Sequence, residues 1–259
     1  GFCLSVLAAY HHFKFPPILP LFLNLYGHDS TLAGAFMSVY AIAGLLLSLS
    51  FGSALRGARL AIYLQIAFAL FILGSLATLV WPDKGWVVLA ARGVEGIGFS
   101  VLAIAGPALC MVHAGRAGLP YAAALVAAWI PCGALLSSVI GATTSNSGEW
   151  QILWWFGIFL TLTMWVWVIR RSDQDSTFFL TPATGVRESN KVATWQRNAQ
   201  IFSAMLFALW SCQLFGFMTW LPQFLVSVHE LTLGNAIIGY SLPLVTIGIF
   251  NFAAAPILR

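Results

Sequence analysis

Long apolar segments separated by short polar turns restrict the fold of this chain more than any other feature. Of its 259 residues, 60% are hydrophobic and only 8% are charged, whereas a soluble domain is about 25% charged. A membrane-spanning helix needs about 20 apolar residues, so the chain has room for about eight spans joined by short loops. We therefore predict an all-α polytopic membrane protein.

The predicted spans alternate with turns of a few residues. They cover residues 1–25, 31–52, a third range ending at Val80, 85–113, 119–142, 150–169, 201–226 and 233–258. The prolines of the first span (Pro16, Pro17 and Pro20) predict a kink near its middle, because proline removes a helical hydrogen bond. We expect Ser30 or Thr31 to cap the second span. Several tryptophans near span ends fit anchoring at the membrane interface, namely Trp81, Trp86, Trp150 and Trp220.

Basic residues fall on one side of the predicted topology. Nine of the twelve Lys and Arg residues lie in the loops after the second, fourth and sixth spans or at the end of the chain. They are Arg56, Arg59, Arg116, Arg170, Arg171, Arg187, Lys191, Arg197 and Arg259, whereas the opposite loops hold only Lys84. The positive-inside rule then places Gly1, the loop 170–200 and Arg259 in the cytoplasm. No basic cluster with interleaved aromatic residues indicates nucleic-acid binding.

Two charged residues stand inside the apolar segment 85–113. Arg92 and Glu95 are three residues apart, which puts both on one helical face. Because a charge in the bilayer is costly, such residues need an internal partner or a wet cavity, and they indicate a functional site. Gly96 and Gly98 follow them and predict close approach of another helix. Whether Arg92 and Glu95 form a salt bridge is left open.

The first span carries three further titratable residues. Lys14 lies about 15 Å from the outer end of its span at 1.5 Å per residue, and Glu95 lies at a similar depth. His11 shares a helical face with Lys14, whereas His12 does not. Snorkelling of Lys14 to the cytoplasmic interface is the alternative for that residue.

The segments at the two ends of the chain resemble one another. Ile18-Leu19-Pro20-Leu21-Phe22-Leu23 aligns with Trp220-Leu221-Pro222-Gln223-Phe224-Leu225, Thr31-Leu32 with Thr232-Leu233, and Leu55-Arg56 with Leu258-Arg259. Both copies enter the membrane in the same direction, as in a parallel repeat.

On these residues the chain resembles the major facilitator superfamily of secondary transporters. Arg92 followed by Gly96 and Gly98 is similar to the fourth-helix motif of that family, and six spans, a long loop and a second similar set follow its plan. The resemblance implies twelve spans, of which about eight are present, so we expect an excerpt of a longer protein. It implies a six-helix bundle over residues 1–169, a cytoplasmic linker over 170–200 and the first two helices of a second bundle over 201–259.

Two motifs depart from the family pattern. The loop Gly52-Ser53-Ala54-Leu55-Arg56-Gly57-Ala58-Arg59 lacks the usual acidic residue, which puts the cytoplasmic gating salt bridge in doubt. The segment Ile130-Pro131-Cys132-Gly133-Ala134 keeps only Pro131 and Gly133 of the fifth-helix antiporter motif, which disfavours drug–proton antiport. We expect Gly96, Gly98, Pro131 and Gly133 to serve helix packing.

The resemblance implies a cavity lined by the first, fourth, seventh and tenth spans, where Lys14 and Glu95 would meet. We expect solute binding by Arg92, Lys14, His11, Gln213 and Trp210, and proton coupling by Glu95 and His12. Asn24 is a further candidate for the cavity lining.

The predicted function is transport of a small anion by alternating access, coupled to protons or another ion. The partners are therefore the solute, the coupling ion and the lipid bilayer, and no cofactor, metal or catalytic residue is expected. The alternatives are a transporter-like receptor or assembly protein without flux, or an exporter of neutral or cationic compounds. A membrane-embedded enzyme is disfavoured because paired ligand spacings such as HExxH are missing.

Overall fold

The structure is a computed structural model that describes residues 1–54, 60–144, 147–174 and 194–254. Within these ranges it is helical and contains no strand. The elements are α1 (Phe2–Phe13), the 3-10 helix η1 (Pro16–Ile18), α2 (Leu19–Tyr26), α3 (Ser30–Ala54), α4 (Leu60–Val80), α5 (Gly85–Val112), α6 (Gly115–Thr144), α7 (Gln151–Gln174), α8 (Thr194–Ser227) and α9 (Leu233–Ala254).

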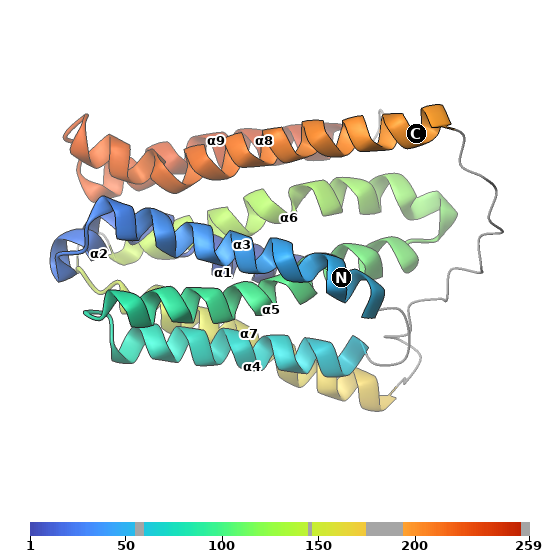
Figure 1. Ribbon diagram of the computed structural model, residues 1–259, viewed down its shortest axis with the longest axis horizontal. Helices are drawn as coiled ribbons and strands as arrows, with labels where there is room; N and C mark the ends of the chain where they lie inside the picture. The colour runs from blue at the N-terminus through green and yellow to red at the C-terminus, as the bar shows by residue number, and fades with distance from the viewer. Residues whose placement is uncertain (55–59, 145–146, 175–193, 255–259) are drawn as a thin grey trace.

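The helices lie side by side along the long axis of the molecule (Figure 1). Seven helices in the described ranges, α3 to α9, are long and apolar enough to cross a membrane. The segment made of α1, η1 and α2 supplies the eighth predicted span in broken form. The predicted all-α polytopic bundle is confirmed, and the chain is an integral multi-pass membrane protein.

The first span breaks where its prolines predicted a kink. α1 ends at Phe13, and Pro16 and Pro17 begin the 3-10 turn η1. Two adjacent prolines remove two backbone donors, which interrupts the helical hydrogen bonds, although Phe15 before them keeps helical dihedral angles (φ −80°, ψ −47°). Single prolines elsewhere, such as Pro107 in α5 and Pro222 in α8, lie inside continuous helices. A single proline removes one helical hydrogen bond, a loss that membrane helices tolerate.

Some predicted helix ends are wrong. Asp29, rather than Ser30 or Thr31, caps α3, since its Oδ1 accepts a 2.7 Å hydrogen bond from the backbone N–H of Leu32. α6 begins at Gly115, α7 continues to Gln174 and α8 begins at Thr194, so these helices extend beyond the apolar ranges. A helix forms its backbone hydrogen bonds internally whatever its side chains are. Its polar end residues can therefore continue the helix from the bilayer into water.

Trp150 also departs from its predicted role. It is buried and donates from Nε1 to the Tyr26 hydroxyl over 3.1 Å, so it packs inside the bundle rather than anchoring it in the membrane interface. The arginines of the loop 52–59 and the pair Leu55-Arg56 with Leu258-Arg259 lie outside the described residues, as does most of the linker.

α5 is the central helix of the bundle, since it packs on α1, α3 and α4. Gly96 faces α3, where an added Cβ would lie 2.5 Å from the carbonyl oxygen of Tyr40. Gly98 faces α4, where a Cβ would lie 2.9 Å from the carbonyl oxygen of Ala67. α6 packs on α1 through Gly133, whose added Cβ would overlap Ala9, and α9 packs on α6 and α8.

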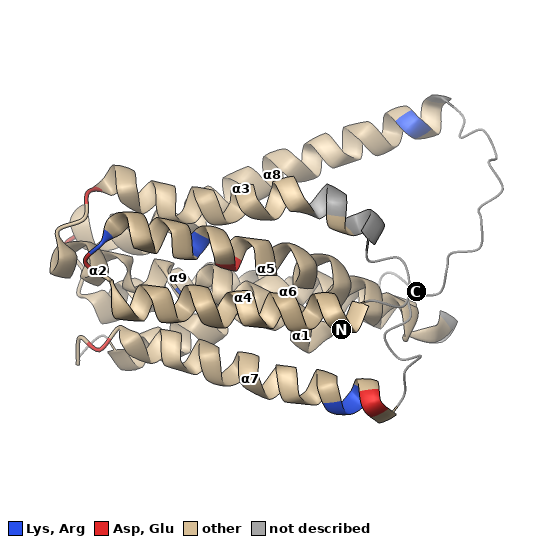
Figure 2. Ribbon diagram, turned by 60° about the horizontal axis from the view of Figure 1, so that its bottom comes forward, with Lys and Arg blue, Asp and Glu red and all other residues tan. Residues whose placement is uncertain are grey.

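Charged residues concentrate at the two ends of the bundle (Figure 2). Asp29, Asp83 and Lys84 belong to the turns that join α2 to α3 and α4 to α5, at one end. Arg170 and Arg171, near the end of α7, lie at the opposite end. Three charged residues lie in the middle of the bundle instead: Arg92 and Glu95 on α5, and Lys14, the C-cap of α1.

Candidate functional site

Lys14 occupies the break in the first span. It is the C-cap of α1, where its backbone N–H bonds to the carbonyl of Tyr10 over 2.8 Å. Tyr10 fixes this end of α1 to α7, since its hydroxyl donates to the carbonyl of Leu153 over 2.7 Å. Because Pro16 has no N–H, the carbonyl of His12 has no helical donor four residues ahead. The break therefore supplies both a cation and a free carbonyl in the interior.

Arg92 joins α5 to this break. Its Nη1 donates to the carbonyl of His11 over 3.0 Å, and its Nη2 donates to the carbonyl of His12 over 3.2 Å. The same Nη1 lies 2.6 Å from Oε2 of Glu95. The guanidinium carbon also lies 4.1 Å from the centre of the Tyr40 ring, a cation–π distance. Arg92 thus satisfies the carbonyls that the broken helix leaves without donors.

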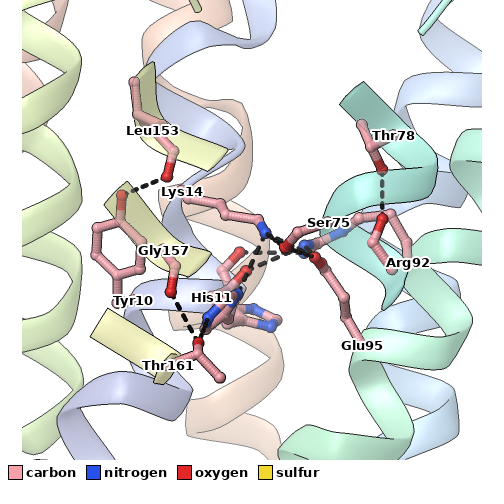
Figure 3. Close-up of polar contacts among 12 residues, drawn as sticks. Tyr10, His11, Lys14, Ser75, Thr78, Arg92, Glu95, Leu153, Gly157 and Thr161 are labelled. Carbon is pink, nitrogen blue, oxygen red and sulfur yellow. Dashed lines mark hydrogen bonds and ion pairs between the residues drawn. The ribbon is translucent and has the colours of Figure 1, made fainter. Parts of the chain in front are cut away.

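Glu95 is bound by two cations (Figure 3). Its Oε1 lies 2.6 Å from Nζ of Lys14 and accepts a 2.7 Å hydrogen bond from the Ser75 hydroxyl of α4. Its Oε2 accepts from Arg92. All three neighbours donate to the oxygens of Glu95, which is the arrangement that an acceptor-only carboxylate makes.

The hydrogen bonds of His11 determine its tautomer. The Thr161 hydroxyl donates to the carbonyl of Gly157 over 2.7 Å, so its oxygen accepts from His11 Nε2 over 2.8 Å. Nδ1 is then free of a proton and accepts from Lys14 Nζ over 3.2 Å. Lys14 Nζ also donates to Ser75 over 2.8 Å. Its three donors are all used, as a protonated ammonium requires, and His11 is neutral.

We call Lys14, Arg92, Glu95, Ser75 and His11 the charge network. Each of these side chains is fully buried, and the network links α1, α4 and α5, with Thr161 extending it to α7. Its formal charge is +1, because two cations oppose one carboxylate. Such an arrangement holds the helices in register, and its excess charge gives the surrounding interior a positive potential.

His12 lies outside the charge network, on the other side of α1. Its ring contacts the rings of Tyr40 and Phe215 at centroid distances of 4.8 and 5.0 Å. Its buried Nδ1 has no hydrogen-bond partner among the described residues. His12 lines a cavity of about 170 Å³ between α1, α3 and α8, together with Ser38 and Thr219.

A second cavity lies between α1, α6, α8 and α9. It has a volume of about 270 Å³, and apart from Asn251 its lining is apolar, with Phe13, Trp129 and Trp210 among the wall residues. Pro131 also lines it. The ring of Phe13 stacks on Phe215 at 5.5 Å, and Phe215 belongs to the wall of the His12 cavity.

The structure brings together only part of the predicted site. Lys14 meets Glu95 and Arg92, and His11 joins them, so the alternative of a snorkelling Lys14 is wrong. Gln213 and Asn24 are exposed and line neither cavity, whereas Trp210 lines the apolar one. Ser75, Thr161 and Tyr40 were not predicted. Ser and Thr side chains in a helix also bond to the backbone of their own helix, so their presence in the sequence does not by itself indicate a partner on another helix.

Comparison with known proteins agrees with this architecture. Among curated proteins no relative matches the chain. The family model of the Major Facilitator Superfamily matches residues 1–259, which is the entire chain. The chain therefore belongs to the Major Facilitator Superfamily of membrane transporters.

Proposed function

We propose that the protein is a secondary active transporter that moves a small anion by alternating access, coupled to protons. The bundle 1–169 and the bundle that begins after the linker rock about the cavities between them. Residue Gly1 and the linker 170–200 are cytoplasmic, because the basic loop residues gather on that side. The protein operates in the plasma or inner membrane.

The observation that carries this proposal is the buried charge network at the break in the first span. Membrane interiors disfavour charges, so three fully buried charged side chains in one place need a reason beyond packing. Lys14 belongs to the first span and Glu95 to α5, and their 2.6 Å contact fixes one span against the other. A proton on Glu95 removes the negative charge that holds the two cations, which frees the first span to move.

The excess charge of the network favours an anionic solute. Two cations and one carboxylate leave +1 in a region of low dielectric constant, where the resulting potential is strong. An anion close to the network offsets this charge, whereas a cation adds to it. Charge balance thus supports an anion over the neutral or cationic compounds that an exporter would carry.

The experiment separates coupling from binding in proteoliposomes that contain the full-length protein. The double variant Lys14→Met with Glu95→Gln keeps the formal charge of +1 but has no carboxyl group that binds a proton. We expect it to exchange radiolabelled anion across the membrane while losing accumulation driven by an imposed proton gradient. Retained accumulation would show that Glu95 is not the proton carrier.

The receptor alternative is tested by the same vesicles. If the unmodified protein neither exchanges nor accumulates any anion of a broad panel, it acts without flux.

The second cavity favours one other candidate, an exporter of neutral lipophilic compounds, because its lining is almost entirely apolar. Inhibition of anion exchange by such compounds without their own transport would argue against that candidate.

A further inference from the structure

Hydrogen-bonding groups without partners occur at one edge of the charge network, on Arg92 and on the side chains that contact it. Seven buried side-chain nitrogen or oxygen atoms in the described residues lack a partner, and three of them belong to side chains in contact with each other. These are Nδ1 of His12, the hydroxyl of Tyr40 and Nε of Arg92. Leaving a buried polar group unpaired is unfavourable, so three such groups on side chains that touch one another point to a nearby site for a ligand.

The three side chains form one continuous surface. The rings of His12 and Tyr40 lie 4.8 Å apart, and the Arg92 guanidinium lies over the Tyr40 ring at 4.1 Å. Arg92 also donates to the backbone carbonyl of His12 over 3.2 Å. Arg92 and Tyr40 are sealed from the exterior, whereas His12 lines the cavity between α1, α3 and α8. His12 is therefore the member of this group that a solute meets first.

The walls of the cavity define the chemistry of that solute. Ser38 and Thr219 add hydroxyl groups, and Met37, Phe215 and Trp220 add apolar and aromatic surface. No carboxylate lines this cavity in the part of the chain that the structure describes. The volume of about 170 Å³ is below the range of about 300–1,000 Å³ for drug-sized ligands, so the solute is small.

The charge of the site selects a monoanion. The charge network next to His12 carries +1, which a single negative charge neutralises and a dianion such as hydrogen phosphate would exceed. The apolar walls favour an organic body over an inorganic ion, because burying apolar surface is favourable. A short-chain monocarboxylate meets both requirements.

We propose that His12 binds the carboxylate of a short-chain monocarboxylate solute, with the Tyr40 hydroxyl and the Arg92 charge behind it. The carbon chain of the solute packs on Phe215 and Trp220. This inference rests on the proposed transport function and names its substrate class. It also assigns His12 to solute binding in place of the proton coupling predicted from the sequence.

The test is equilibrium binding of radiolabelled propionate to the purified full-length protein in detergent. We expect saturable binding that nitrate does not displace. Propionamide, which has the same shape without the charge, should compete at least about tenfold more weakly, equivalent to about 1.4 kcal/mol. Equal competition by propionamide or effective competition by nitrate would overturn the assignment of an organic monoanion.

Variants of His12 test the residue itself. His12→Phe keeps a ring of similar size among the aromatic neighbours, and it should weaken propionate binding at least about tenfold, or about 1.4 kcal/mol. His12→Gln restores a hydrogen-bonding group and should recover part of the affinity. His229→Phe makes the same exchange in the turn between α8 and α9 and should bind normally. Thermal unfolding of each variant establishes that it is folded.

The outcomes distinguish this inference from the proposed function. Unchanged binding in folded His12→Phe, or no binding of propionate by the unmodified protein, overturns the inference. Binding that depends on His12 without flux in vesicles supports the inference and contradicts the transport function. Anion transport that is indifferent to His12→Phe supports the function and contradicts the inference.

Discussion

Loss of the Glu95 charge should destabilise the protein more than loss of the Lys14 charge. Glu95→Gln preserves the size of the side chain but leaves Lys14 and Arg92 buried without an anion. Both cations lie 2.6 Å from the carboxylate and neither is exposed. Removing one partner of a buried ion pair costs about 3–5 kcal/mol. A change of this size lowers the Tm of a protein of 150–250 residues by on the order of 10 °C.

Lys14→Met gives the matched comparison. It removes a cation, yet Glu95 keeps its ion pair with Arg92 and its hydrogen bond from Ser75. The principal loss is the donor to His11 Nδ1, an unmade hydrogen bond worth about 1–3 kcal/mol. The double variant Lys14→Met with Glu95→Gln should be more stable than Glu95→Gln alone, because only one cation remains unpaired.

Thermal unfolding of the purified full-length variants in one detergent measures this order. The expected ranking of Tm is unmodified protein, Lys14→Met, the double variant and then Glu95→Gln. The cycle of four proteins also yields the coupling energy between the two residues. A Glu95→Gln variant as stable as the unmodified protein, or less affected than Lys14→Met, would refute the description of Glu95 as the anion that holds both cations.

Two further predictions concern packing and orientation. Gly133→Ala should destabilise the protein by about 1–3 kcal/mol, because the added methyl group overpacks against Ala9. Gly93→Ala is the control, since its added methyl group would meet only a methyl group at 3.8 Å and should be tolerated. A comparison of Tm and abundance checks both variants. In a cysteine-free background, a cysteine at Gln174 should react with an impermeant maleimide only from the cytoplasmic side and one at Asp83 only from outside, and labelling of both positions from one side would contradict the topology.

The helical architecture was predictable because each span carries its own signal. An apolar range of sufficient length predicts a helix whatever its neighbours are, and the two adjacent prolines Pro16 and Pro17 predicted the break. Helix ends were less predictable. The first turn of α6 and the polar ends of α7 and α8 are helical although their sequences are not apolar, since a helix in water is limited by its capping rather than by hydropathy.

The candidate site was predictable only as far as depth and helical face determine it. The rise per residue placed Lys14 and Glu95 at one depth, and a spacing of three placed His11 beside Lys14. The contacts that complete the network come from other helices, at Ser75 in α4 and Thr161 in α7. Nothing in the periodicity of α4 or α7 marks these hydroxyl residues, because their partners are brought together by helix packing alone.

The completeness of the charge network bears on where the solute binds. Lys14 donates three hydrogen bonds inside the protein, and the terminal nitrogens of Arg92 donate to Glu95 and to two backbone carbonyls. A solute could claim these groups only by displacing Glu95 or reopening the helix break, each of which leaves buried polar groups unpaired. The Nδ1 atom of His12 has no hydrogen-bond partner among the described residues, and His12 lines a cavity. The energetics therefore favour a division of roles in which Arg92 and Lys14 supply the positive potential and His12 supplies the contact.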